Sequence, residues 1–407
     1  MKLGRMSESV ALLLALAVTA GAASAAVRTG LDRVSDFQQL FADKRIGIIA
    51  NQSAIDSQGR PVAQVIRALP GATLVSLFAP EHGWWGAQGA GRKVSEQMHP
   101  LFQIPVHSLY GSATKPTPAM LDAVDVLVFD IQDIGTRFYT YIWTMALAME
   151  AAAEQGKTFV VLDRPNPIGG TNVEGNLLEP DYASFVGLYP IPVVHGMTVG
   201  ELARMFNGQG WLAGAVEADL VVVPMEGWTR NMWFDQTGLV FRRPSPNMPD
   251  LETAALYPGM ALLEGTNLSE GRGTTMPFKQ FGAPWIDANS LTEGLNRLRL
   301  PGVRFEPTQF TPTHSKHKGL RCFGARIRIT DRTQLTSYQS AIRILEEVAR
   351  QYPQLLMWRP EHFNKLCGTR DVRQVILGHG SLDALVARWD SERRRFLSVR
   401  ERYLLYR

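Results

Sequence analysis

The stretch Val126-Leu127-Val128-Phe129-Asp130-Ile131-Gln132-Asp133 decides the fold class, because an uninterrupted apolar run ends abruptly in polar residues. Continuous apolarity is typical of strands that are covered on both faces. Comparable runs are found at Ile46–Ala50, Thr73–Phe78, Ile104–Leu109, Val124–Phe129, Thr158–Leu162 and Leu220–Pro224. Helical patterns separate them at Pro61–Leu69, Thr117–Asp122, Tyr141–Gln155 and from Thr198, where Glu201 completes a capping box. The alternation predicts a doubly wound, mostly parallel, Rossmann-like α/β sheet.

Residues 1–25 predict a signal peptide. Lys2 and Arg5 give a basic start, residues 10–20 are almost wholly apolar, and Ala23-Ser24-Ala25 is a small-x-small cleavage site. The apolar run is too short to span a bilayer, which takes about 20 residues. We therefore expect an exported protein, periplasmic or extracellular, without a stable membrane anchor; an uncleaved anchor is the alternative.

The remaining chain is predicted to form two domains, residues 27–243 and residues 250–407, on either side of the proline-rich segment 243–249. The second is expected to be a smaller α+β domain that is rich in loops as far as Trp285. Helices are expected there near Leu291–Leu298 and Gln334–Gln351, and strands near Val303–Phe305 and Leu320–Ile329. Cys322 and Cys367 are the only cysteines, and whether they pair stays open.

Composition narrows the possible functions. The chain is 45% hydrophobic and 20% charged, and its formal net charge of +4 is not gathered into a basic run, so we expect no nucleic-acid partner. His314 and His317 alternate with Lys316 and Lys318, whose charges oppose a cation, so no metal site is expected. The glycines near Gly89 form no dinucleotide fingerprint, and no cofactor is expected.

Polar residues follow five strands of the predicted parallel sheet. Since the carboxyl ends of parallel strands share one edge, where ligands of such sheets bind, these residues are predicted to converge. They are Asn51-Gln52, Glu81-His82-Gly83-Trp84-Trp85, Tyr110, Asp130–Arg137 and Asp163-Arg164-Pro165-Asn166. The alternative is that single members only cap helices or hold turns.

Hydrolysis of a glycosidic bond requires a carboxylic acid and a second group that handles water or the oxocarbenium ion. Glu81 suits the first role, because Trp84 beside it would provide an apolar setting that favours a protonated carboxyl group. Asp130 and Asp133 are candidates for the second role, and their spacing suggests that only one faces the cleft. His82 is the remaining catalytic candidate. In the alternative reading, Glu81 caps a helix and the tryptophans belong to the core.

Four motifs resemble one known family. Pro80–Gly83, Asp130–Tyr141, Asp163–Pro167 and Glu264–Thr274 are similar to the exo-β-N-acetylmuramidases of the NamZ type, a family long labelled a domain of unknown function. The resemblance extends from about Gly30 to the C-terminus. It implies a Rossmann-like domain and an auxiliary C-terminal domain with the active site between them. It also implies release of N-acetylmuramic acid from the non-reducing end of β-1,4-linked peptidoglycan glycan, with Glu81 as the catalytic glutamate.

A substrate site follows as an expectation from these motifs. Its predicted members are Asn51, Gln52, Trp84, Arg137, Tyr139, Arg164, Asn166, Glu264, Asn267, Glu270 and Arg272. Since muramic acid carries a lactyl carboxylate, an arginine is expected to bind it, in the order of preference Arg272, Arg137, Arg164. Two other functions stay open. One is a wall-glycan-binding protein without catalysis, and the other is a serine acylase, for which Ser112–Lys115 and Ser315–Lys318 match the S-x-x-K pattern.

Overall fold

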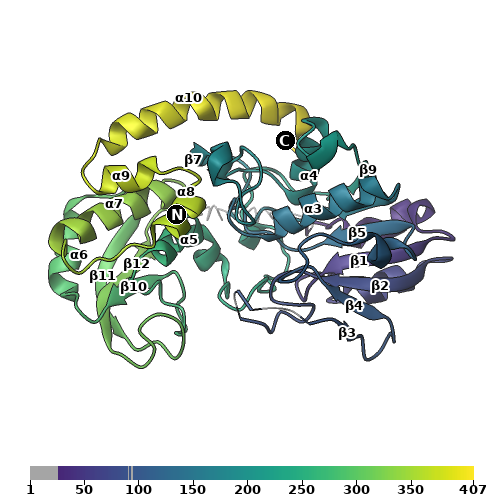
Figure 1. Ribbon diagram of the computed structural model, residues 1–407, viewed down its shortest axis with the longest axis horizontal. Coiled ribbons are helices and arrows are strands. Elements are labelled where there is room, and N and C mark those ends of the chain that lie inside the picture. The colour runs from purple at the N-terminus through teal and green to yellow at the C-terminus, as the bar shows by residue number, and fades with distance from the viewer. Residues whose placement is uncertain (1–25, 90, 93–94) are drawn as a thin grey trace, which may run out of the picture.

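The computed structural model describes residues 26–89, 91–92 and 95–407, so the predicted signal peptide lies outside the described residues. The chain forms an N-terminal lobe, up to about residue 249, and a C-terminal lobe from Asp250 onward (Figure 1). Among the described residues, no helix has the length and apolar character needed to cross a membrane.

A seven-stranded sheet organises the N-terminal lobe and confirms the predicted fold class. Neighbouring strands are parallel except at the edge, where β3 runs antiparallel to β4. In spatial order the strands are β3 (Gln97–Met98), β4 (Pro105–Ser108), β2 (Thr73–Ala79), β1 (Arg45–Ala50), β5 (Val126–Asp130), β6 (Thr158–Leu162) and β9 (Asp219–Val223). All six predicted strands are therefore present, each within two residues of its expected ends.

Both faces of this sheet are covered, which explains the continuous apolar runs. Along β5, Val126 and Val128 pack into one hydrophobic cluster and Leu127 and Phe129 into another. The first cluster is completed by η1 (Leu31–Leu40) and α1 (Val62–Arg67), and the second by α3 (Tyr141–Glu154) and α4 (Val199–Gly208). Successive side chains of a strand point to opposite faces, so every residue of a doubly covered strand must be apolar.

Short local signals of the N-terminal lobe are also confirmed. α4 begins with the predicted capping box, in which the Thr198 hydroxyl accepts the N–H of Glu201 and the Glu201 side chain accepts the N–H of Thr198. Thr117 caps α2 (Pro118–Leu121). β7 (Glu174–Leu177) and β8 (Pro192–Val194) form a separate antiparallel pair.

The C-terminal lobe is built on a three-stranded antiparallel sheet. Its strand order is β10 (Gln280–Ala283), β12 (Cys322–Ile329) and β11 (Val303–Phe310), and its helices are α5 (Leu251–Met260), α6 (Ala288–Arg297), α7 (Ser337–Gln351), α8 (Pro360–Cys367) and α9 (Asp371–Ile376). Cys322 and Cys367 are both buried and free.

One prediction for this lobe is wrong: the stretch before Trp285 is not mainly loop, because it contains α5, the short helix η5 (Ala261–Gly265) and β10. α5 is buried all round from Thr253 to Met260, so its sequence has no amphipathic period that marks a surface helix.

The chain finally returns to the N-terminal lobe along α10 (Leu382–Arg400), which spans the top of the molecule in Figure 1. The guanidinium of Arg400 donates to the carbonyl oxygens of Gly170 and Gly196. The Tyr406 hydroxyl donates to the buried carboxyl group of Asp163 at 2.6 Å. The last residues therefore belong structurally to the N-terminal lobe, although they come at the end of the sequence. A single boundary in the sequence does not separate the two lobes completely.

Candidate active site

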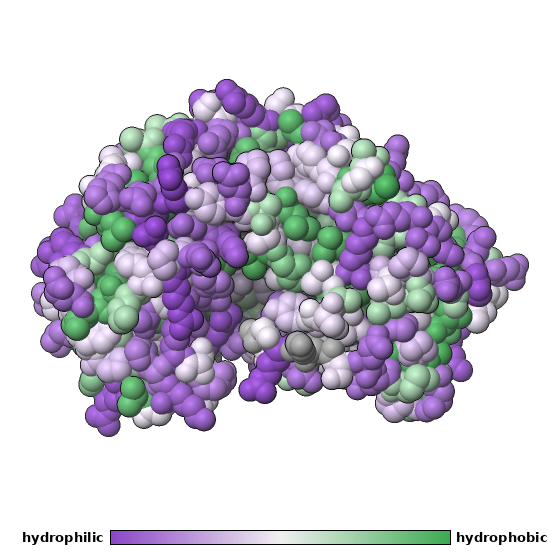
Figure 2. All heavy atoms as spheres, in the orientation of Figure 1, coloured by the Kyte–Doolittle hydropathy of each residue, from purple (hydrophilic) through white to green (hydrophobic). Residues whose placement is uncertain are grey.

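A cavity of about 560 Å³ lies between the lobes, and Figure 2 shows the surface hollowed where they meet. Both lobes line it. The N-terminal lobe contributes Glu81, His82, Gly91, Tyr110, Phe138, Tyr139, Thr140, Tyr141, Phe185, Val186, Ser245, Asn247 and Met248; the C-terminal lobe contributes Tyr257, Glu264, Arg272, Phe278, Arg359, His362 and Leu366. A volume of this size is typical of a small-molecule site.

Glu81 reaches the cavity directly from the carboxyl end of β2. One of its carboxyl oxygens, Oε1, accepts the N–H of Gly91 at 3.1 Å, and Oε2 accepts the hydroxyl of Thr140 at 2.9 Å. The Tyr110 hydroxyl is a third neighbour; burial, and then the charge of Glu81, raises the pKa of Tyr110 to about 12. The carboxyl group is thus fixed by groups from three separate segments of the N-terminal lobe.

His82 presents a neutral ring to the same cavity. Its Nδ1 lies 2.8 Å from the carbonyl oxygen of Gln88, and since a carbonyl can only accept, Nδ1 carries the proton. Burial lowers the pKa of His82, and Arg272 adds to that effect while Glu81 opposes it. The unprotonated Nε2 is therefore left as a hydrogen-bond acceptor.

A group of charges from the C-terminal lobe forms another part of the wall. Arg272 lies 2.9 Å from a carboxyl oxygen of Glu264 and 3.6 Å from one of Glu270. Glu270 also binds Lys316 at 2.9 Å. Burial by itself would raise the pKa of Glu264, but Arg272, followed by His362, lowers it to about 2. Glu264 is therefore ionised, and the charge of Arg272 is already matched by carboxylates.

Aromatic rings in edge-to-face contact make up the remaining wall. Tyr139 meets Tyr141 at a centroid distance of 4.9 Å and Tyr257 at 5.7 Å, and Tyr257 meets Phe278 at 4.8 Å. The Tyr141 hydroxyl donates to the Pro244 carbonyl at 2.7 Å. Burial raises the pKa of all three tyrosines, so they remain neutral. Edge-to-face packing stabilises such a wall without adding charge to it.

The structure brings only part of the predicted site together. Of the predicted residues, those that line the cavity are Glu81, His82, Tyr139, Glu264 and Arg272. Glu270 lies behind Arg272 and is almost wholly buried. The aromatic setting of Glu81 comes from tyrosines and phenylalanines, because Trp84 lines a different cleft together with Asn51 and Gln52.

The expectation that Asp130 or Asp133 faces the cavity is wrong. Asp130 is fully buried, and both of its oxygens are bound by the guanidinium of Arg164, which is thereby also occupied. Asp133 is 5% exposed, and its Oδ2 accepts the N–H of Gly135 at 2.7 Å. Asp130 thereby ties the end of β5 to the segment after β6, and Asp133 holds the turn after β5, so neither carboxyl group lines the cavity.

Arg137 is likewise not available to a substrate carboxylate. Its side chain is inaccessible and donates to four carbonyl oxygens, those of Asn176, Ile191, Leu366 and Cys367. The first two belong to the N-terminal lobe and the last two to α8, so this guanidinium joins the lobes. Burial lowers the pKa of Arg137 to about 10.

Two predicted asparagines have structural hydrogen bonds. The Asn166 amide donates to the Met197 carbonyl and accepts the N–H of Ile168. The Asn267 amide donates to the Leu355 carbonyl at 2.9 Å and accepts a backbone N–H at the same distance. Neither asparagine lines the cavity, because each is consumed in holding one loop against another.

Sequence reasoning missed several residues of the wall, notably Thr140, Tyr257, Arg359 and His362. Thr140 lies inside the motif from Asp130 to Tyr141, so the sequence located it near the site but did not reveal its hydrogen bond to Glu81. Arg359 and His362 flank the first turn of α8, whose sequence Pro360-Glu361-His362 repeats the order of Pro80-Glu81-His82. That repetition was the one available signal.

Comparison with known proteins agrees with this two-lobed arrangement. The family model for the N-terminal part of exo-β-N-acetylmuramidase NamZ matches residues 46–252, and the model for its C-terminal part matches residues 255–406. The chain belongs to the NamZ family. The two matches meet beside the proline-rich segment, and the cavity takes its lining from both. The family resemblance found in the sequence is therefore confirmed.

Individual members of the NamZ family cover nearly the whole chain. The peptidoglycan β-N-acetylmuramidase NamZ of Bacillus subtilis strain 168 is 46% identical over 382 residues, which is 93% of this chain and 91% of that protein. Two crystal structures of DUF1343 family proteins from Bacteroides fragilis NCTC 9343 each match 94% of this chain and 99% of theirs. One has a TM-score of 0.86 at 37% identity and the other 0.72 at 31% identity.

Proposed function

We propose that this protein is a glycoside hydrolase, an exo-β-N-acetylmuramidase that releases N-acetylmuramic acid from the non-reducing end of β-1,4-linked peptidoglycan glycan. One observation carries the proposal. Glu81 projects from the end of β2 into a cavity that both halves of a NamZ-family chain close, and its carboxyl group is oriented by Gly91 and Thr140. The Bacillus subtilis relative, a peptidoglycan β-N-acetylmuramidase, is in agreement with it.

In this mechanism Glu81 is the general acid that protonates the glycosidic oxygen as the bond to the leaving sugar breaks. Glu264 takes the second catalytic role, for which Asp130 and Asp133 were the candidates in the sequence. Among the described residues it is the other carboxyl group that lines the cavity, and Arg272 keeps it ionised, so its charge stabilises the oxocarbenium-like transition state. The neutral His82 ring and the tyrosine hydroxyls are left to bind sugar hydroxyl and acetamido groups.

The decisive experiment is an assay with a chromogenic β-N-acetylmuramide and with the disaccharide MurNAc-β-1,4-GlcNAc. A muramidase liberates free N-acetylmuramic acid from both. A glycan-binding protein would bind the disaccharide without cleaving it, and that result would refute the proposal. A serine acylase would be labelled by a β-lactam; neither Ser112 nor Ser315 lines the cavity.

Arg359 is the cation that best suits the lactyl carboxylate of muramic acid. It lines the cavity, its side chain is exposed, and it forms no ion pair with a carboxylate among the described residues, whereas Arg272 is held by Glu264 and Glu270. A free guanidinium binds a carboxylate with charge assistance. Arg359 therefore replaces Arg272 as the arginine expected to bind the lactyl carboxylate, because the charge of Arg272 is already matched by Glu264 and Glu270.

Changing Arg359→Ala is therefore expected to weaken muramide binding by about 1.5 kcal/mol, roughly a tenfold rise in KM. Activity on the matched glucosaminide, which lacks the lactyl group, should change little. The measurement is kcat/KM on both substrates for Arg359→Ala and for Arg272→Ala. If only Arg272→Ala alters the ratio between the substrates, Arg272 and not Arg359 binds the carboxylate.

We further propose that the protein is exported and that cleavage follows Ala25. The residues directly after that point belong to the fold, since Val27 is buried and its N–H donates to the Thr237 carbonyl at 2.9 Å. The mature protein is expected to begin at Ala26 or Val27 and to be found outside the cytoplasm. Mass spectrometry of the N-terminal peptide from each cell fraction measures this. An intact chain beginning at Met1 in the cytoplasm would contradict it.

A further inference from the structure

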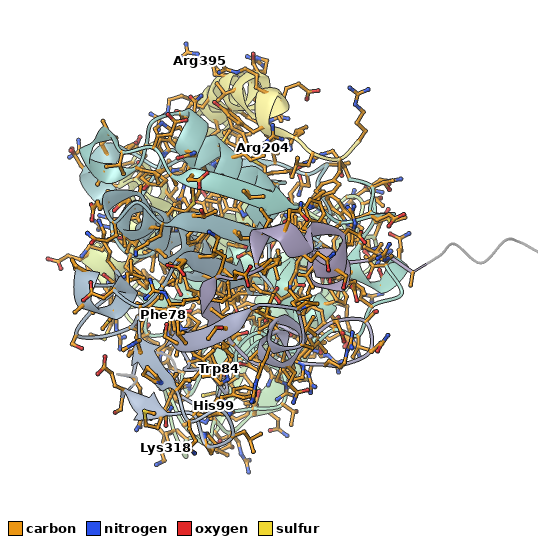
Figure 3. The ribbon with its side chains drawn as sticks, turned by 90° about the vertical axis from the view of Figure 1, so that its right-hand side faces the viewer. Phe78, Trp84, His99, Arg204, Lys318 and Arg395 are labelled. Atoms are coloured by element: carbon orange, nitrogen blue, oxygen red, sulfur yellow. The ribbon has the colours of Figure 1, made fainter. Side chains whose placement is uncertain are left out.

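A second cleft, of about 340 Å³, shares no lining residue with the active cavity. We call it the aromatic cleft, and its principal residues are Asn51, Gln52, Trp84, Trp85, His99 and Phe102. The first two follow β1, the tryptophans follow β2, and the last two precede β4. Figure 3 shows Trp84 and His99 close together, below Phe78 of β2.

The cleft contains a stack of three flat rings. Trp85 is stacked on His99 at a centroid distance of 5.7 Å, and His99 is stacked on Phe102 at 4.4 Å, while Trp84 meets the His99 ring edge-on. Burial lowers the pKa of His99, so the stack carries no charge. Trp85 is 45% exposed, an unusual position for an indole already held in a stack.

Amide groups lie next to this stack. The Gln52 side chain donates from Nε2 to the carbonyl oxygens of Arg243 and Pro244, while its buried Oε1 has no hydrogen-bond partner among the described residues. That oxygen is covered by the protein, where the Gln52 side chain packs against Gly86, so it is not offered to a ligand. The exposed side chains of Gln64 and Arg242 also line the cleft. A neutral ring stack with polar side chains beside it matches a sugar, which has apolar C–H faces and a hydroxylated edge.

The aromatic cleft and the active cavity take lining residues from two common chain segments. In the first, Glu81 lines the cavity and Trp85 lines the cleft; the turn between them has left-handed backbone angles at His82 and Gly83. In the second, Arg242 lines the cleft and Ser245 lines the cavity. Four residues of chain span at most about 14 Å, a distance that a short oligosaccharide bridges.

We propose that the aromatic cleft is a second glycan-binding site, which holds a distal sugar of the strand whose non-reducing end occupies the active cavity. The inference rests on the proposed function. It explains why Asn51, Gln52 and Trp84 gather at the ligand-binding edge of the sheet and yet do not line the active cavity. Its consequence is that affinity depends on chain length, because a monosaccharide occupies only the active cavity whereas an oligosaccharide reaches both sites.

The test compares a chromogenic monosaccharide muramide with peptide-free glycan strands of about ten sugars. In Trp85→Ala we expect kcat and KM for the monosaccharide to stay at wild-type values, because Trp85 does not line the active cavity. KM for the strands should rise about fivefold to tenfold, as expected when an aromatic contact is lost. Trp85→Phe keeps a flat ring and should restore most of the affinity. Leu377→Ala, at an exposed leucine outside both sites, is the matched control.

Two results would overturn the inference. One is an unchanged KM for the strands in Trp85→Ala, and the other is an equal rise for both substrates, which would place Trp85 in the active cavity. A wild-type protein that does not cleave the monosaccharide would refute the proposed function instead. In that event the binding of the same strands to wild type and to Trp85→Ala, measured by calorimetric titration, tests the aromatic cleft independently of catalysis.

Discussion

Glu81→Gln is expected to lower turnover of MurNAc-β-1,4-GlcNAc by a factor of about a hundred or more, since general acid catalysis contributes roughly 10²–10⁴. The amide has the shape of the carboxyl group: its oxygen can still accept the N–H of Gly91, and its NH2 group can donate to the Thr140 hydroxyl, which reverses that hydrogen bond. It cannot deliver a proton to the glycosidic oxygen. The loss should therefore appear in kcat, with KM close to the wild-type value.

A comparison of two leaving groups makes this experiment specific for the role of a general acid. An aryl muramide releases a stabilised phenolate, which needs less protonation than a sugar hydroxyl does, so Glu81→Gln should lose far less activity on the aryl substrate than on the disaccharide. Circular dichroism and the melting temperature serve as controls for folding. Equal losses on both substrates would mean that Glu81 is not the acid. Near-normal activity on the disaccharide would remove it from the mechanism.

Asp130→Asn is expected to destabilise the protein by about 3–5 kcal/mol, because it leaves the Arg164 guanidinium buried without its counter-charge. Asp130 is wholly buried and Arg164 is 6% exposed. The effect should appear as a lower urea midpoint with an unchanged slope. Asp133→Asn should cost much less, since the amide oxygen can still accept the N–H of Gly135.

A double variant separates stability from chemistry at this pair. Asp130→Leu combined with Arg164→Met removes both charges, and replacing a buried ion pair by apolar residues is often neutral or stabilising. The double variant should therefore be more stable than Asp130→Asn and should keep substantial turnover. A stable Asp130→Asn protein that has lost activity as completely as Glu81→Gln would show instead that Asp130 takes part in catalysis.

Local sequence determined the elements of the N-terminal lobe and their order. β6 was predicted to the residue, and the capping box at Thr198 was predicted with its partner Glu201. These signals are local because a strand buried on both faces must be apolar throughout, and a helix N-terminus is satisfied by side chains within one turn. Glu81 was found for the same reason, since a residue directly after a parallel strand lies at the ligand-binding edge.

Tertiary structure decided which polar side chains at that edge remain free. Asp130 ends β5, and Arg137 and Asn166 lie in the segments after β5 and β6, yet each forms its hydrogen bonds with partners that sequence spacing does not reveal. The acceptors of Arg137 in α8 lie 229 and 230 residues further along the chain.

The same holds for the half of the cavity that the second lobe supplies. Glu264 and Arg359 come to face the cavity only when the two lobes dock and α10 returns the chain to the first lobe. Hydrogen bonding and ion pairing of buried groups depend on long-range packing, whereas strand and helix formation here depends mainly on neighbouring residues. The sequence by itself therefore determined the sheet, its ligand-binding edge and Glu81, and the packing of the lobes decided what surrounds Glu81.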